Sequence, residues 1–131
     1  MGINPGDGEI SEDISQDFTY NAQDYIKDAQ RGDTDAQFIL AECYKEGKGI
    51  NQDYTKAVEW YEKALKANTN VDDKHILFLA VVYKNIAECY LNLKENKKAL
   101  KYLKKALAIY ESQGSGNNAE AVKKAIMRCG L

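Results

Sequence analysis

The tetrapeptide Ala-Glu-Cys-Tyr occurs twice in this chain, at residues 41–44 and again at residues 87–90. A similar block of aromatic, basic and small residues follows each copy, at residues 60–65 and 102–107. Self-similarity at a period of roughly 20 to 50 residues is typical of repeat proteins, in which each unit buries its apolar face against the next. The sequence therefore predicts an all-α array of antiparallel helical hairpins, with function on a surface rather than in a catalytic cleft.

The two hairpins are expected to differ in their turns. The first turn contains Gly47, which can end a helix in the left-handed conformation, and Asp53, which can cap the next helix. The second turn, residues 91–96, is shorter and has no glycine. We therefore expect two hairpins with the same core and different connections.

The second unit, residues 80–113, resembles a tetratricopeptide repeat, which has aromatic and small residues at fixed spacing. Its matching positions are Tyr83, Ile86, Ala87, Tyr90, Ala99, Leu103 and Ala106. The first unit resembles the Sel-one-like repeat, a longer relative with a glycine-bearing turn. It matches at Ala29, Gly32, Ala36, Gln37, Leu40, Tyr44, Gly47, Gly49, Ala57, Trp60 and Ala64, and departs at Ala41, where glycine is usual. The resemblance implies a right-handed α-solenoid.

The chain is expected to contain a single helical-repeat domain at residues 15–131. An acidic, glycine-rich leader at residues 1–14 precedes it and is expected to be disordered. Within the domain we expect a half-repeat helix at 15–31, the Sel-one-like repeat at 32–68, the tetratricopeptide repeat at 72–113 and a capping helix at 117–129.

Several classes of function find no support in the sequence. The single histidine, His75, has no recognisable nucleophile, phosphate loop or metal-ligand pattern beside it, so we expect no enzyme, no cofactor and no metal. No run of about 18 apolar residues is present, so no membrane span is expected. Three cysteines, Cys43, Cys89 and Cys129, are expected to be buried in a reducing compartment, and the cytoplasm is the expected location.

Charge is distributed unevenly along the chain. Residues 1–73 carry 16 acidic and 7 basic side chains, a net charge of −9, whereas residues 74–131 carry 4 acidic and 11 basic side chains, a net charge of +7. Five lysines fall on one side of a turn and helix: Lys94, Lys97, Lys98, Lys101 and Lys105. They form either a solvated outer face or a docking site for an acidic partner or an anionic surface. Few aromatic residues accompany them, which disfavours nucleic-acid binding.

The resemblance also implies a concave groove lined by set positions of the first helix of each hairpin. In the first unit these are Asp35, Phe38, Glu42 and Glu46, and in the second Val81, Lys84, Glu88 and Asn92, with Asn85 adjoining them. Apolar groups and charges of both signs suit an extended or helical peptide. Related grooves bind a C-terminal carboxylate with a lysine and an asparagine, but Glu88 stands in place of that asparagine and would repel the carboxylate.

Residues 76–83 are eight consecutive apolar residues, more than one core-facing stripe of a helix requires. Either the preceding loop or the N-terminal helix covers the excess, or Leu77 and Phe78 form an exposed patch. Such a patch would bury itself on a partner or on a second copy, giving a weak homodimer.

These observations predict a non-catalytic adaptor or scaffold that binds a peptide or a segment of a partner protein in its groove. Two alternatives remain open. One is a small tetratricopeptide-type chaperone for a secreted partner, and the other is a regulatory domain of a larger enzyme or signalling protein.

Overall fold

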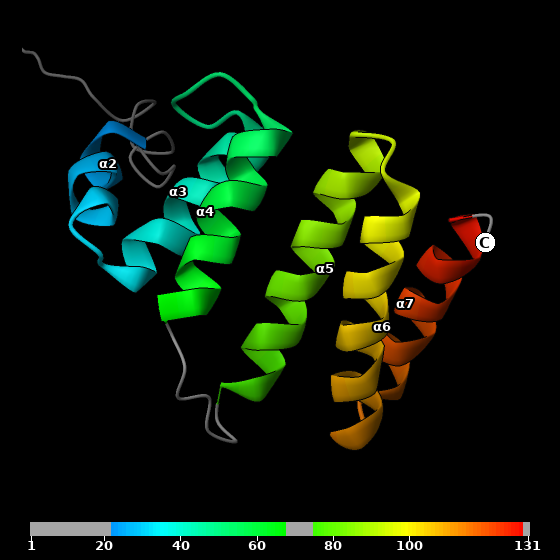
Figure 1. Cartoon of the computed structure of the whole chain (residues 1–131). Coiled ribbons are helices and arrows are strands. Elements are labelled where there is room, and N and C mark those ends of the chain that lie inside the picture. Colours follow the sequence, from blue (N-terminus) through cyan, green and yellow to red (C-terminus); the bar gives the residue numbers. More distant parts are fainter. Residues whose placement is uncertain (1–21, 68–74, 130–131) are drawn as a thin grey trace, which may run out of the picture.

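A computed structural model describes residues 22–67 and 75–129, which form six α-helices. In chain order these are α2 (Ala22–Gln30), α3 (Thr34–Glu46), α4 (Tyr54–Ala67), α5 (Ile76–Asn92), α6 (Asn96–Ser112) and α7 (Gly116–Arg128). Each helix packs chiefly on its neighbours in the sequence, so α3 with α4 and α5 with α6 form successive hairpins (Figure 1). The predicted all-α hairpin array is confirmed. The predicted leader at 1–14 and the start of the half-repeat helix lie outside the described residues.

The turn inside the first hairpin has the predicted chemistry. Gly47 ends α3 with φ 72°, and its N–H donates to the Cys43 carbonyl oxygen at 2.7 Å. The Asp53 carboxylate then accepts a hydrogen bond from the Lys56 N–H at 3.0 Å in the first turn of α4. Both local predictions are confirmed, because each depends only on residues close in sequence.

The turn inside the second hairpin reverses the chain direction without a glycine. Lys94 takes its place with φ 64°, the one positive φ at a non-glycine residue in the described part of the chain. Left-handed backbone costs an L-residue about 1–2 kcal/mol, because Cβ crowds the following carbonyl. Lys94, which the sequence placed only in the lysine patch, therefore also shapes the turn.

Small buried side chains let the helices approach closely. Ala41 and Ala57 are fully buried between the hairpins, together with Ile86. Ala41, at a position where the Sel-one-like repeat usually has glycine, is thus small enough for this close packing. Cys43 and Cys89 are also fully buried and unpaired, as predicted, and act as small apolar side chains.

Helix α7 packs against α6 at the end of the described chain. Ala119, Val122 and Cys129 are buried in the last core cluster, while Met127 is 78 % exposed. One face of α7 thus completes the core and the other faces solvent.

Candidate interaction groove

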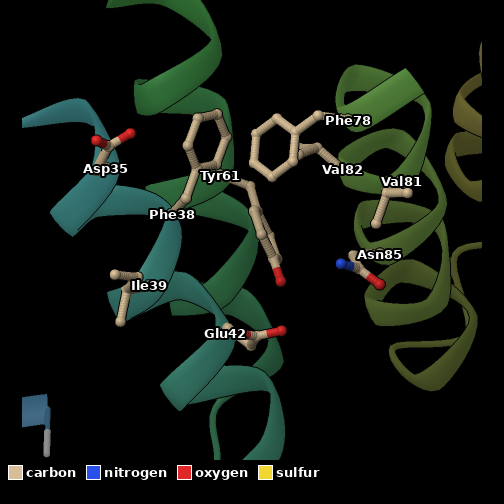
Figure 2. A pocket seen from close by; sticks show the side chains of 9 residues that line it. All are labelled: Asp35, Phe38, Ile39, Glu42, Tyr61, Phe78, Val81, Val82 and Asn85. Atoms are coloured by element: carbon tan, nitrogen blue, oxygen red, sulfur yellow. The ribbon is translucent and has the colours of Figure 1, made fainter. Parts of the chain in front are cut away.

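A concavity lies between α3 and α5, the first helices of the two hairpins. It has a volume of about 390 Å³. Its walls and floor come from Asp35, Phe38, Ile39, Glu42, Tyr61, Phe78, Val81, Val82 and Asn85 (Figure 2). Only Tyr61 comes from α4, and we call this concavity the α3/α5 groove.

One end of the α3/α5 groove is apolar and open. The rings of Phe38 and Phe78 meet edge to face, with centroids 5.1 Å apart and planes at 88°. Phe78 is 49 % exposed, and Leu77 and Val81 are each 43 % exposed. The expected apolar patch therefore reaches solvent and continues into the groove. Of the two segments that could have covered it, the preceding loop includes residues 68–74 and the N-terminal helix begins before residue 22, and those residues lie outside the described ranges.

The other end of the α3/α5 groove is polar. The Tyr61 side chain rises from the floor, and its hydroxyl lies between the side chains of Glu42 and Asn85 (Figure 2). Tyr61 is only 2 % exposed, and its hydroxyl oxygen has no hydrogen-bond partner among the described residues. The Asn85 amide is turned toward it. Burial and then the negative charge of Glu42 raise the pKa of Tyr61, and Asn85 lowers it in part, so the hydroxyl stays protonated and uncharged.

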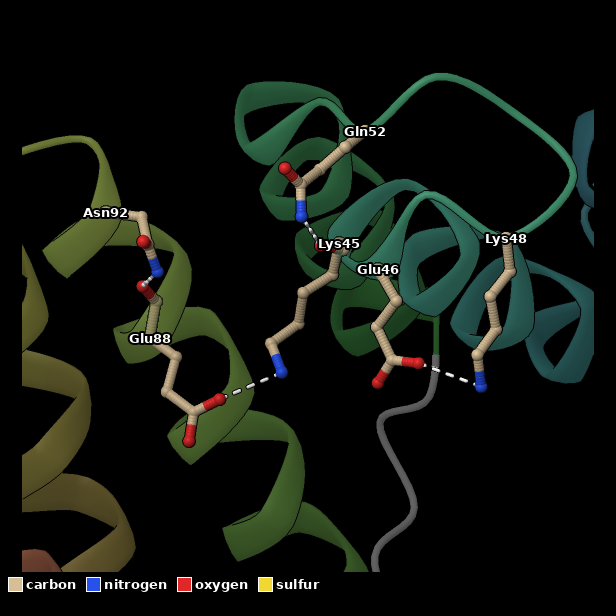
Figure 3. A network of polar contacts seen from close by, with 6 residues as sticks. All are labelled: Lys45, Glu46, Lys48, Gln52, Glu88 and Asn92. Atoms are coloured by element: carbon tan, nitrogen blue, oxygen red, sulfur yellow. Dashed lines mark hydrogen bonds and ion pairs between the residues drawn. The ribbon is translucent and has the colours of Figure 1, made fainter.

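An ion pair joins the two repeats beside this polar end. Lys45 of α3 and Glu88 of α5 approach to 2.8 Å (Figure 3). The Lys45 side chain is 17 % exposed and that of Glu88 is 41 % exposed. Burial lowers the pKa of Lys45, but the hydrogen bond and the charge of Glu88 outweigh burial and raise it overall. Glu88 is the carboxylate that argued against binding of a partner's C-terminal carboxylate. It is already paired with the Lys45 ammonium.

The remaining two groove residues in this region are engaged in polar contacts. Glu46 pairs with Lys48 at 2.8 Å, and the Asn92 amide donates to the Glu88 carbonyl oxygen at 2.8 Å (Figure 3). Both side chains remain exposed.

A second concavity of about 270 Å³ follows between α5 and α7. Lys84, Glu88 and Arg128 supply its charged groups, and Leu91, Leu103 and Val122 supply apolar surface. Lys84 therefore faces a different hollow from Phe38, and the predicted groove is divided into two parts. The first part is acidic and apolar, whereas the second carries two basic side chains.

The five lysines of the predicted patch are all exposed. Two of them have specific neighbours, since the Lys98 ammonium pairs with Glu95 at 3.1 Å and lies 5.6 Å from the centre of the Tyr90 ring. Lys105 lies 5.4 Å from the Tyr83 ring centre and 5.5 Å from that of Tyr102. These contacts give part of the patch an intramolecular role through cation–π attraction. Binding of an acidic partner there stays a prediction.

Of the nine predicted groove residues, five line the α3/α5 groove: Asp35, Phe38, Glu42, Val81 and Asn85. Three further lining residues, Ile39, Tyr61 and Val82, were not predicted from the sequence. Ile39 and Val82 adjoin predicted positions and could have been included as their neighbours. Tyr61 gave no such signal, because it occupies a buried core position of the second helix.

Two other features, a metal site and a membrane-spanning helix, were sought among the described residues. Within 22–67 and 75–129, no group of three or more His, Cys, Asp or Glu side chains is placed to hold a metal ion. None of the helices in those two ranges combines the length and apolar character needed to cross a membrane.

Stacked hairpins with a groove between their first helices define a helical-repeat protein. A family model described as tetratricopeptide repeat matches residues 39–112, more than half of the chain. The chain therefore belongs to the tetratricopeptide repeat family, whose members are protein–protein interaction modules. No curated protein and no solved structure matches it.

Proposed function

We propose that this protein is an adaptor that binds a segment of a partner protein in its concave groove, chiefly in the α3/α5 groove. The observation that carries the proposal is the exposed apolar end of that groove. Phe78 and Val81 remain 49 % and 43 % exposed, although the opposite face of the same helix is buried at Ala80, Ile86 and Ala87. A rigid scaffold that keeps such side chains open gains hydrophobic free energy only when another molecule covers them.

The first hairpin can be assigned to a more specific class of repeat. We infer that residues 32–68 form a Sel-one-like repeat, which is supported by the longer turn with Gly47 and Gly49 at φ 72°. Both hairpins place their first helices beside the α3/α5 groove, so both would contact one partner.

The groove is tested by selecting peptides from a random library displayed on phage, with the full chain as target. Selected peptides should bind the wild type and lose at least about tenfold in affinity to a Phe38→Ala, Phe78→Ala double variant, because two large apolar contacts are removed. Lys101→Ala, on α6, is the matched surface control and should bind normally. Circular dichroism of each variant establishes that the helices remain.

Nuclear magnetic resonance then locates the peptide. Amide signals of α3 and α5 should shift on titration, whereas those of the lysine patch should not. Peptides that bind the double variant as well as the wild type, or a selection that yields none, would rule out the groove as the binding site. Shifts confined to Lys97, Lys98 and Lys101 would instead support the lysine patch.

A further inference from the structure

The polar end of the α3/α5 groove carries information about what the partner must contain. This inference rests on the proposed function, because it concerns the chemistry of the segment that the groove binds. Glu42, Tyr61 and Asn85 converge at that end from three different helices (Figure 2). Each carries a hydrogen-bonding group, and the apolar end with Phe38 and Phe78 adjoins them.

The Tyr61 hydroxyl is an unsatisfied group. Its oxygen is buried and has no hydrogen-bond partner. A buried hydroxyl without a partner costs roughly 1–3 kcal/mol, and native proteins contain few of them. Such a group beside a groove can gain a hydrogen bond when a ligand arrives, once the Asn85 side chain turns aside.

The charged side chains that line the α3/α5 groove are acidic. Asp35 and Glu42 line the α3/α5 groove, and none of the described residues that line it is basic. Lys45 follows Glu42 by three residues on α3, but its ammonium is held 2.8 Å from Glu88. Glu42 itself makes no ion pair with another described residue. A carboxylate accepts hydrogen bonds only, so the group that satisfies it must be a donor and is best a cation.

We propose that the α3/α5 groove recognises a partner segment that pairs a large apolar side chain with an arginine or lysine. The apolar side chain would contact Phe38 and Phe78. The cation would bind Glu42 and donate to the oxygens of Tyr61 and Asn85. Arginine suits the site better, because its fork of N–H groups can serve several acceptors at once.

Helix geometry sets the spacing of the two groups. Phe38 and Glu42 are four residues apart on α3, and Phe78 and Asn85 are seven apart on α5. At about 1.5 Å per residue, the apolar and polar ends are roughly 6–10 Å apart along the groove. If the ligand is helical, its apolar and basic side chains match this distance when they are three or four residues apart, because the arginine side chain is long. An extended segment meets it at two or three residues.

We place the segment on another molecule rather than on residues 1–21 of this chain. The longest part of this chain outside the described residues, 1–21, contains five acidic residues and no Lys or Arg. It therefore lacks the required cation and would be repelled by Asp35 and Glu42. A second copy could offer Arg128 beside the exposed Met127, and the experiment below tests for it.

The test uses the phage-selected peptides described above. They should be enriched in Arg or Lys within four residues of a large apolar residue. One selected peptide is then synthesised with arginine and with citrulline, which has the same shape and no charge. Fluorescence anisotropy should show about tenfold weaker binding of the citrulline peptide to the wild type, equivalent to about 1.4 kcal/mol.

Variants of the protein show which side chain recognises the charge of the peptide arginine. In Glu42→Gln the two peptides should bind within about twofold of each other, whereas Glu59→Gln, an exposed substitution on α4, should keep the tenfold difference. Tyr61→Phe should weaken the arginine peptide and leave the citrulline peptide almost unchanged. Because Glu42 is partly exposed and the phenyl ring of Tyr61 is retained, neither substitution disturbs the core.

The outcomes separate this inference from the proposed function. Peptides that need Phe38 and Phe78 but show no basic enrichment, or equal binding of the arginine and citrulline peptides, would overturn the inference and leave the groove proposal standing. Loss of the dependence on Phe38 and Phe78 would overturn the groove proposal itself. Analytical ultracentrifugation without peptide tests for a second copy in the groove. A dimer that Arg128→Gln abolishes would show that the groove binds another copy of this chain, and would overturn the inference of a different partner.

Discussion

Removing a single oxygen atom from two tyrosines should change stability in opposite directions. The Tyr61 hydroxyl is buried and has no hydrogen-bond partner, whereas the Tyr102 hydroxyl donates to the Glu62 carboxylate at 2.6 Å. Tyr61→Phe relieves the desolvation cost of an unsatisfied hydroxyl and should stabilise the fold by about 1–2 kcal/mol. Tyr102→Phe removes a charge-assisted bond at a partly exposed site and should destabilise it by about 1–2 kcal/mol.

Urea unfolding followed by circular dichroism measures both effects. The denaturant slope for a protein of this size is roughly 1–3 kcal/mol per molar urea, so the midpoint should rise by about 0.5–1 M for Tyr61→Phe and fall similarly for Tyr102→Phe. The slope itself should not change, because neither substitution alters the surface exposed on unfolding.

Loss of stability in Tyr61→Phe would refute the reasoning. It would show that the hydroxyl donates to Glu42 or Asn85 in solution, and that this end of the groove is already satisfied. The gain would also disappear on saturation with a cationic peptide, since the hydroxyl would then have a partner in the wild type and none in the variant.

Three further predictions follow from particular contacts. Burial raises the pKa of Cys89 to about 11 and also raises that of Cys43, so a thiol reagent at mildly alkaline pH should label neither in the native protein and both in guanidinium chloride; rapid native labelling would contradict the burial. Lys94→Gly should raise the free energy of unfolding by about 0.5–1 kcal/mol in urea titrations, because glycine adopts the φ of 64° without strain; a less stable variant would show that the turn needs the lysine. The folded-state pKa of Lys45 is raised by Glu88, so their ion pair stabilises the protein below about pH 10 and ceases to do so as the pH rises through the folded-state pKa. The stability difference between the wild type and Lys45→Met should therefore shrink at alkaline pH, and a pH-independent difference would exclude the ion pair as its source.

The sequence by itself determined the hairpins and their turns. Repeat spacing predicted an all-α array, and Gly47 and Asp53 predicted how the first turn begins and ends. These features depend on residues within a few positions of one another, where backbone preference and capping chemistry act locally. The resemblance to the tetratricopeptide repeat also predicted which positions of the first helices line a groove, and the alignment of the two units extended that prediction to the first hairpin.

Only the tertiary structure decided which of those residues face one another. The contact of Phe38 with Phe78 joins residues 40 positions apart, and the ion pair of Lys45 with Glu88 spans 43 positions. Such contacts depend on how one hairpin is rotated and displaced against the next, which follows from the packing of many small side chains at once. The same packing brings the Tyr61 hydroxyl from a core position of α4 to the floor of the groove, where no local pattern in the sequence could have placed it.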